Sequence, residues 1–170
     1  MDQFLAAIEN ALQSSNWYAA LLVALALPDI AGWVNDPAAG SRARYAAWVE
    51  QYLSPTYTSE IGADHVHHKF LSGDDCYALR CSLLHEGRDE IAHQRVQDAL
   101  DRFQFTAPVQ GLIVHRNQVG AKLQLQVDVF CRDICQAIRT WLASIPAGDR
   151  DRRDRLGQLA VIHTGPGLQI

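Results

Sequence analysis

The apolar run from Trp17 to Leu27 limits the fold of this chain more than any other feature. It is eleven residues long and ends at Pro28-Asp29, whereas a helix that crosses a membrane needs about 20 apolar residues. The run therefore predicts a helix buried in a protein core. Ser14-Ser15-Asn16 offers its N-cap, and Ile30 and Trp33 are placed to extend it past Pro28 with a kink.

The start of the chain carries no sign of export. Met1-Asp2-Gln3 lacks the positive charge of a secretory signal, and no small-residue cleavage site follows a short apolar core. The four cysteines, in pairs five and four residues apart, match neither a CxxC knuckle nor the framework of a small secreted protein. We expect a cytoplasmic protein without membrane contact, whose cysteines pack as small hydrophobic residues.

The 170 residues fit a single domain, residues 1–170. A period of two over residues 112–116 and 123–129, with a short turn at 117–120, predicts a β-hairpin over about 109–129. Residues 55–70 fit no single pattern, and Asp149 to Arg155 is expected to be a solvated loop. The sequence thus predicts a mostly α protein, a helical bundle with one inserted β-hairpin. Helical spacing of apolar residues marks its further helices, over residues 4–12, 41–53, 72–87 and 129–145.

The net charge of −4 is spread unevenly along the chain. Residues 1–70 hold 3 Lys or Arg against 7 Asp or Glu, and residues 71–170 hold 12 against 12. An acidic chain lacks the overall field that draws proteins to nucleic acid. RNA binding by this chain would therefore need a local basic cleft, including one completed by a second subunit.

Residues 74–87, with the sequence DDCYALRCSLLHEG, combine an acidic helix start, an apolar middle and a His-Glu-Gly stop. The acidic side chains suit the positive end of the helix dipole, and Gly87 is the natural residue to end the helix. Arg80 and His85 stand on this helix with four residues between them. An arginine offers phosphate a planar fork of donors, and a histidine exchanges protons near neutral pH. The pair is therefore a candidate for chemistry on a phosphate.

This R-x4-H spacing within a helical bundle resembles the HEPN superfamily, including its small uncharacterised members on bacterial chromosomes and plasmids. The resemblance implies a HEPN-like fold and a metal-independent endoribonuclease that needs no cofactor. It also implies that His85 is the acid/base, that Arg80 clamps the phosphate, and that the product ends in a 2′,3′-cyclic phosphate. The implied partners are RNA, a second copy of the chain in a homodimer and, for a toxin or phage-defence component, a cognate antitoxin.

Helix geometry gives a reason for such a dimer. Five residues advance about 7.5 Å and turn about 140°, so a regular helix does not present Arg80 and His85 on one face. Two such helices across a two-fold axis can form a shared cleft. Many active HEPN proteins carry Asn, Asp or His directly after the arginine, whereas this chain has cysteine, a weaker hydrogen-bonding group. Weaker candidates for contact with RNA are Cys81, Ser82, Glu86 and Arg88 around the motif, and His67 and His68 before it.

The same helix also fits a protein without catalysis. Arg80 could pair with Asp75 or Glu86 on the bundle surface, and His85 could act only as a C-cap that complements the helix dipole. A HEPN-derived module that binds RNA or a partner protein is therefore the first alternative. An Arg80 whose charge is fully satisfied by a carboxylate would favour it.

The stretch Asp64-His65-Val66-His67-His68 gives a second alternative. Imidazole and carboxylate groups are good zinc ligands, so His65, His67 and His68 could hold a metal in a helical bundle. We favour an exposed loop with solvated histidines, because no pair of histidines has the H-x3-H spacing of a metal site on a helix.

Two other patterns bear on RNA binding. Arg88, Arg95 and Arg102 recur every seven residues, as a stripe that follows phosphates would, but their acidic neighbours favour a solvated helix face. A set of aromatic residues is spaced as part of a core rather than as a platform for bases. These residues are Trp17, Tyr18, Trp33, Tyr45 and Trp48.

Overall fold

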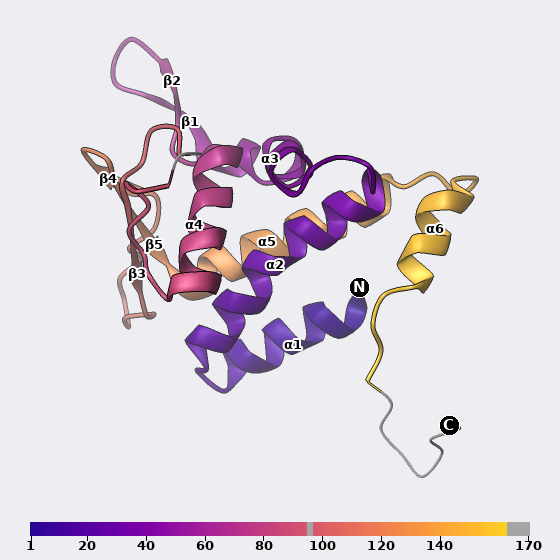
Figure 1. The fold of residues 1–170 in the computed structure, drawn as a ribbon. Coiled ribbons are helices and arrows are strands. Elements are labelled where there is room, and N and C mark those ends of the chain that lie inside the picture. The colour runs from indigo at the N-terminus through magenta and orange to yellow at the C-terminus, as the bar shows by residue number, and fades with distance from the viewer. Residues whose placement is uncertain (95–96, 163–170) are drawn as a thin grey trace.

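The computed structural model describes residues 1–94 and 97–162. Within them the chain is mostly helical, as predicted, with two small sheets to one side of the helices (Figure 1). The helices are α1 (Asp2–Gln13), α2 (Trp17–Asn35), α3 (Ser41–Tyr52), the short 3₁₀ helix η1 (Ser54–Tyr57), α4 (Gly73–Glu86), α5 (Val127–Ser144) and α6 (Arg150–Gly157). The strands are β1 (Thr58–Ile61), β2 (Val66–Lys69), β3 (Arg102–Thr106), β4 (Asn117–Val119) and β5 (Lys122–Gln126).

Helix α2 lies at the centre of the bundle and contacts α1, α3, α4, α5 and α6. Asn16 caps it, as its side-chain oxygen accepts a hydrogen bond from the Ala19 N–H at 3.2 Å. The helix continues through Pro28 to Asn35, so the extension predicted from Ile30 and Trp33 is confirmed. Because α2 contacts all five other α-helices, a polar side chain on it can meet partners from several elements.

The apolar composition of α2 also satisfies a simple test for a membrane span. Over 18 residues its mean hydropathy is 1.6, and among the described residues it is the one helix long and apolar enough to cross a bilayer. Half of that window is buried inside the protein, and a core helix of a soluble protein meets the same criteria. The contacts of α2 with five other helices fit the predicted core helix.

Two glycines allow α3 to approach its neighbours closely. A Cβ atom on Gly32 of α2 would lie 2.8 Å from the Arg44 carbonyl oxygen, and one on Gly73 of α4 would lie 2.5 Å from the Ala46 carbonyl oxygen. Both oxygens belong to the backbone of α3. The absence of side chains at these two points therefore sets the spacing of α2, α3 and α4.

The predicted hairpin over 109–129 is only partly present. Strands β4 and β5 pair antiparallel, but their turn lies at residues 120–121, and α5 already begins at Val127. Residues 112–116 form no strand. Arg116 has a positive φ of 55°, which breaks the extended backbone, and its guanidinium donates to the Thr56 carbonyl oxygen at 2.6 Å.

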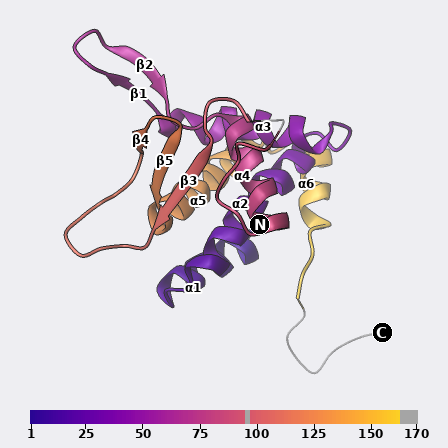
Figure 2. The same cartoon turned by 60° about the vertical axis from the view of Figure 1, so that its left-hand side comes forward.

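Two strand pairings were not predicted. Strand β3 pairs parallel with β5, so β5 is the central strand of a three-stranded sheet in the order β3-β5-β4. Within the ambiguous segment 55–70, β1 and β2 form an antiparallel hairpin. Figure 2 shows this hairpin extending away from the helices, next to the edge of the larger sheet.

The expectation of a loop at Asp149 to Arg155 is wrong, because residues 150–157 form α6. Asp149 acts as its N-cap and accepts a hydrogen bond from the Arg152 N–H at 3.1 Å. Arg155 donates from Nε to the Val34 carbonyl oxygen at 2.7 Å. The Asp-Arg run thus supplies its own cap and a tie to the end of α2, and the segment after α6 passes close to α2.

Candidate functional site

Helix α4 carries the motif and has the ends that its sequence predicts. The Ser72 hydroxyl accepts a hydrogen bond from the Asp75 N–H at 3.1 Å, and Gly87 ends the helix with a φ of 69°. The Asp75 carboxylate is buried and accepts from backbone N–H groups of residues 98–100, the shortest at 2.8 Å from Asp98. Asp75 is therefore occupied in holding the loop that follows α4 and is no partner for Arg80.

Arg80 and His85 meet within one chain. The Arg80 Nη1 atom lies 3.3 Å from His85 Nε2, although the two residues point from different faces of a regular helix. The long arginine side chain spans the difference, so the expected need for a second helix to bring them together does not hold. A guanidinium only donates hydrogen bonds, so His85 Nε2 must accept. In this arrangement the imidazole presents a lone pair at Nε2.

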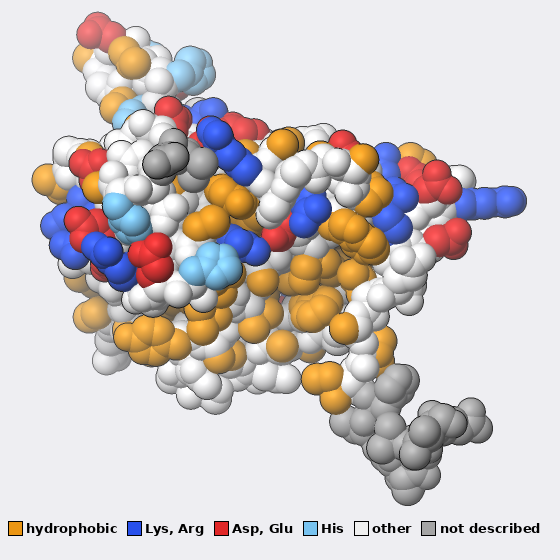
Figure 3. All heavy atoms as spheres, viewed as in Figure 1, with side chains coloured by type: hydrophobic (Ala, Val, Ile, Leu, Met, Phe, Trp, Pro, Cys, Tyr) orange, Lys and Arg blue, Asp and Glu red, His pale blue; other side chains and the backbone are white. Residues whose placement is uncertain are grey.

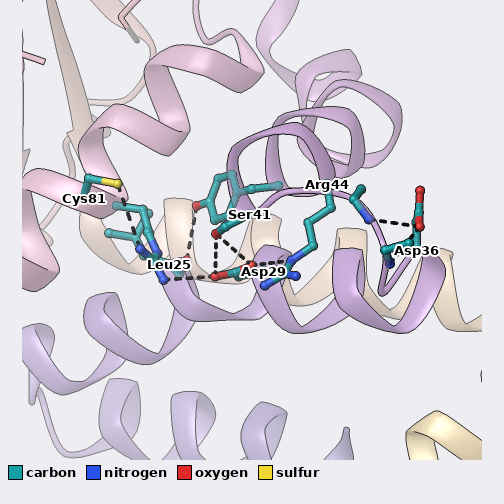
Figure 4. Close-up of polar contacts among 10 residues, drawn as sticks. Leu25, Asp29, Asp36, Ser41, Arg44 and Cys81 are labelled. Atoms are coloured by element: carbon teal, nitrogen blue, oxygen red, sulfur yellow. Dashed lines mark hydrogen bonds and ion pairs between the residues drawn. The ribbon is translucent and has the colours of Figure 1, made fainter. Parts of the chain in front are cut away.

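Asp29 of α2 is the carboxylate that pairs with Arg80. Its Oδ2 lies 2.9 Å from Arg80 Nη2, and its Oδ1 lies 2.9 Å from Nε of Arg44 on α3. The Ser41 hydroxyl donates to the same carboxylate at 3.3 Å. Figure 4 shows Asp29 of α2 facing Ser41 and Arg44 of the neighbouring helix α3. We call these residues, together with His85, the Asp29 cluster; they are Asp29, Ser41, Arg44, Arg80 and His85.

The Asp29 cluster is partly buried and carries a net positive charge. The Asp29 side chain is 14% exposed, and those of Arg44 and Arg80 are 21% and 19% exposed. One carboxylate faces two guanidinium groups, so one positive charge is left over even with His85 neutral. Arg80 Nε is also buried and has no hydrogen-bond partner among the described residues. The positive charge that Asp29 leaves unneutralised suits the binding of an anion.

A cavity of about 360 Å³ opens beside the Asp29 cluster. Its polar wall is formed by Asp29, Arg44 and Arg80. Its apolar wall consists of Ala26, Ile30 and Trp33 of α2 and Leu159, which follows α6. An anionic group attached to an apolar body would therefore find both kinds of contact here.

The residues next to Arg80 differ in their access to this site. Arg80 Nη1 also lies 3.9 Å from Cys81 Sγ, and the Arg80 Cζ atom lies 6.0 Å from the Tyr77 ring centroid. Partial burial, with Cys81 as a second cause, raises the pKa of the Tyr77 hydroxyl. Ser82, predicted as a weak RNA contact, is fully buried, and its hydroxyl donates to the Glu90 carbonyl oxygen at 2.8 Å. Cys81 lies at the site, whereas Ser82 holds the following loop.

Glu86 and Arg88 are exposed but already take part in a surface network of ion pairs and hydrogen bonds. Glu86 accepts from His93 Nε2 at 2.9 Å, and Arg88 pairs with Glu90 at 2.8 Å. The expected pairing of Arg80 with Asp75 or Glu86 is therefore wrong, because both carboxylates have other partners and the partner of Arg80 is Asp29.

The structure does not bring the histidines before α4 to the motif. His67 and His68 lie on β2, which leads into the N-terminal end of α4, whereas His85 lies in its last turn, about 18 Å further along the helix axis. His68 Nε2 is 2.8 Å from Gln118 Oε1 on β4. His65 and His67 instead approach Glu60, at 3.0 and 3.6 Å. The three side chains do not converge, and no group of His, Cys, Asp and Glu suited to a metal occurs among the described residues.

The four cysteines are free thiols that pack as small hydrophobic residues, as expected. Cys76, Cys131 and Cys135 are buried, and Cys81 is partly buried. Burial raises the pKa of the Cys76 and Cys131 thiols to about 12. These buried thiols are therefore neutral and poor ligands for a metal.

Sequence reasoning missed Asp29, Ser41 and Arg44 as parts of the site. A signal was present for Asp29, since it is the one charged residue in the 19 residues of α2. An isolated carboxylate in an apolar helix needs a partner when it is buried. Its presence in α2 therefore indicates a cationic partner elsewhere in the chain. No protein-family model, curated protein or solved structure matches this chain.

Proposed function

We propose that this protein is a metal-independent endoribonuclease of HEPN type that acts through Arg80 and His85. The contact of 3.3 Å between Arg80 Nη1 and His85 Nε2 carries the proposal. It places a histidine lone pair beside a guanidinium in a cluster that has one more positive than negative charge. A base next to a phosphate clamp is what cleavage by the ribose 2′-hydroxyl requires.

The reaction needs no group beyond the RNA and the protein. A phosphate oxygen of the RNA strand accepts the hydrogen bond from Arg80 Nη1, which frees the lone pair on Nε2 of His85. His85 then accepts the proton of the ribose 2′-hydroxyl while the hydroxyl oxygen attacks phosphorus. A 2′,3′-cyclic phosphate forms, the bond to the 5′-oxygen breaks, and an imidazolium supplies the proton to that oxygen. Asp29 and Arg44 hold Arg80 in position throughout.

A homodimer and a cytoplasmic location belong to the same proposal. Helix α2 is apolar nearly all round, and on its outer side Leu22 remains 37% exposed. A helix that is apolar on all faces is usually fully covered. Figure 3 shows hydrophobic side chains gathered on this face beside a small group of basic, acidic and histidine side chains. A second copy of the chain, docked by its own α2, would cover this surface and bring two Asp29 clusters to one cleft.

A module that binds RNA or a partner protein without cleaving it is the second candidate. The ion pair between Arg80 and Asp29 favours it, because a guanidinium already held by a carboxylate binds a phosphate less strongly. The cysteine after Arg80 favours it too, since many active HEPN proteins have a stronger hydrogen-bonding residue there. A toxin or phage-defence role with a cognate antitoxin is compatible with either candidate.

RNA cleavage by purified variants in the presence of EDTA separates the two candidates. His85→Ala should slow cleavage by about 100-fold or more, and Arg80→Lys should slow it because a lysine lacks the planar fork of donors. His67→Ala, at a histidine that is 79% exposed on the projecting hairpin, is the matched control and should cleave at the wild-type rate. The wild-type product should carry a cyclic phosphate. Cleavage by His85→Ala at the wild-type rate would exclude the proposed role of this residue.

Dimer formation is tested by analytical ultracentrifugation. Leu22→Glu places a charge on the apolar face of α2 without touching the Asp29 cluster. We expect a wild-type dimer, and a folded Leu22→Glu monomer that cleaves RNA more slowly because a second Asp29 cluster no longer helps to hold the strand. A wild-type monomer that cleaves RNA would show that the shared cleft is not needed.

A further inference from the structure

A larger cavity lies beyond the last turn of α4. Its volume is about 560 Å³, within the range of about 300–1,000 Å³ that is usual for small-molecule sites. Leu83 and Gly87 line it, and these residues stand on either side of His85 in the sequence. The cavity therefore adjoins the helix end that carries the proposed base.

Three aromatic side chains line this cavity. Trp17 and Tyr18 come from the first turn of α2, and Phe105 comes from β3. Tyr18 is 78% exposed, so the expectation that it belongs to the core is wrong. An exposed tyrosine beside two half-buried aromatic residues is a surface on which a planar ring can stack.

The rim of the cavity is polar but balanced in charge. Arg88 pairs with Glu90 at 2.8 Å, and Arg102 lies 3.4 Å from Asp89. Residues 88–94 and 97–101 form no helix, so the predicted solvated helix face is wrong, and Arg95 lies outside the described residues. Two guanidinium groups and two carboxylates offer donors and acceptors without a net charge. They suit a neutral group with a hydrogen-bonding edge better than they suit a phosphate.

Thr106 gives an independent sign of polar recognition at this cavity. It lines the cavity, and its hydroxyl oxygen is buried without a hydrogen-bond partner among the described residues. A buried hydroxyl left without a partner costs free energy, so such groups are normally satisfied. Thr106 as a residue is only partly buried, and a rotation of its side chain would bring the hydroxyl to a polar atom of a ligand in the cavity.

We propose that this cavity binds an unpaired base of the RNA strand. The inference rests on the proposed ribonuclease function and adds a subsite for recognition. Unpaired bases in RNA are typically recognised by stacking on aromatic side chains and by hydrogen bonds to their edges. The aromatic wall supplies the first kind of contact. The rim of paired charges and the Thr106 hydroxyl supply the second.

Binding of the four nucleosides tests the subsite without the phosphate site. Adenosine, guanosine, cytidine and uridine carry no phosphate, so the Asp29 cluster contributes little to their affinity. We expect one or two of them to bind wild type, with quenching of tryptophan fluorescence from Trp17. Tyr18→Ala should weaken this binding about fivefold or more, since stacking contributes about 1–3 kcal/mol per base. Thr106→Val keeps the shape of the side chain and should change the preference among the nucleosides.

The controls separate failure of the subsite from failure of the proposed function. Ile113→Ala, at a side chain that is 76% exposed outside the cavity, should bind as wild type does, and His85→Ala should bind nucleosides normally. Tyr18 is exposed, so its variant should fold, which circular dichroism checks. The subsite is overturned if wild type binds no nucleoside, or if Tyr18→Ala and Thr106→Val both bind nucleosides as wild type does. Either result leaves the cleavage assay unaffected. Tyr18-dependent binding together with full cleavage by His85→Ala would instead preserve the subsite and overturn the catalytic role of His85.

Discussion

Replacing Asp29 by asparagine tests whether one carboxylate holds three helices together at the site. Asp29→Asn keeps the size of the side chain and one acceptor oxygen, but it removes the charge. Arg44 and Arg80 would then be two like charges, about one fifth exposed, without a carboxylate between them. Both contacts of 2.9 Å join Asp29 of α2 to another helix. Loss of these two ion pairs should therefore lower the stability of the whole fold.

The expected magnitude follows from the burial of the group. Breaking a buried ion pair by removing one partner costs about 3–5 kcal/mol. Water reaches the two arginines in part, so we expect a loss of about 2–3 kcal/mol in the free energy of unfolding. For a chain of this size that corresponds to a fall in Tm of about 4–12 °C. Urea titrations followed by circular dichroism, together with thermal scans, measure both quantities.

A matched control removes another carboxylate from an exposed ion pair. Glu9 of α1 pairs with Arg139 of α5, and both side chains are about half exposed. Glu9→Gln should cost no more than about 1 kcal/mol, because exposed pairs contribute little. A double-mutant cycle with Arg44→Gln should also show coupling to Asp29, since the two side chains are in contact. Asp29→Asn within about 0.5 kcal/mol of wild type would refute the role given to this carboxylate, since that is the spread of ordinary surface changes.

Two further changes should follow from packing and burial. Gly32→Ala should cost about 1–3 kcal/mol, because its Cβ would lie 2.8 Å from the Arg44 carbonyl oxygen and push α3 from α2. Gly157→Ala, which meets nothing within 4 Å, should leave stability unchanged or slightly higher, and denaturant titrations compare the two. Alkaline pH should also destabilise the fold. Burial raises the pKa of Cys76 and Cys131 from 9.0 to about 12, so the folded chain keeps protons that the unfolded chain loses. Stability should be unaffected well below pH 9.0 and should fall as pH rises from there toward about 12, and a flat profile of unfolding free energy against pH would contradict this.

The helices could be predicted because their signals are local. Asn16 caps α2, Ser72 caps α4 and Gly87 ends α4 with a positive φ, each within a few residues of the sequence that predicts it. The strands were harder. The parallel pairing of β3 with β5 joins residues about twenty positions apart in register, and period two in one strand does not say which partner it takes. Helix α6 was missed because its charged surface lacks an apolar stripe to mark its period.

The candidate site also has one part that local sequence predicts and another that depends on distant residues. Arg80 and His85 could be found from their spacing on one helix, but their contact depends on the extended arginine side chain. Asp29, Ser41 and Arg44 reach the site from α2 and α3, and they do so because Gly32 and Gly73 let these helices approach. Nothing local to residue 80 identifies a carboxylate that lies 51 positions earlier. A motif on one helix thus predicts a site only in part, because the other helices set its charge.

The position of Asp29 explains how one arrangement is compatible with both functional candidates. A carboxylate that touches two guanidinium groups orders both of them, yet it cancels only one of their charges. The ordering favours catalysis, because a phosphate clamp must be held in place before the substrate arrives. The partial neutralisation weakens the hold on phosphate and so favours a module that binds without cleaving. Asp29→Asn therefore predicts opposite changes: a less stable fold, but stronger electrostatic attraction of RNA, with a steeper dependence of binding on salt because one more positive charge is exposed to the phosphates.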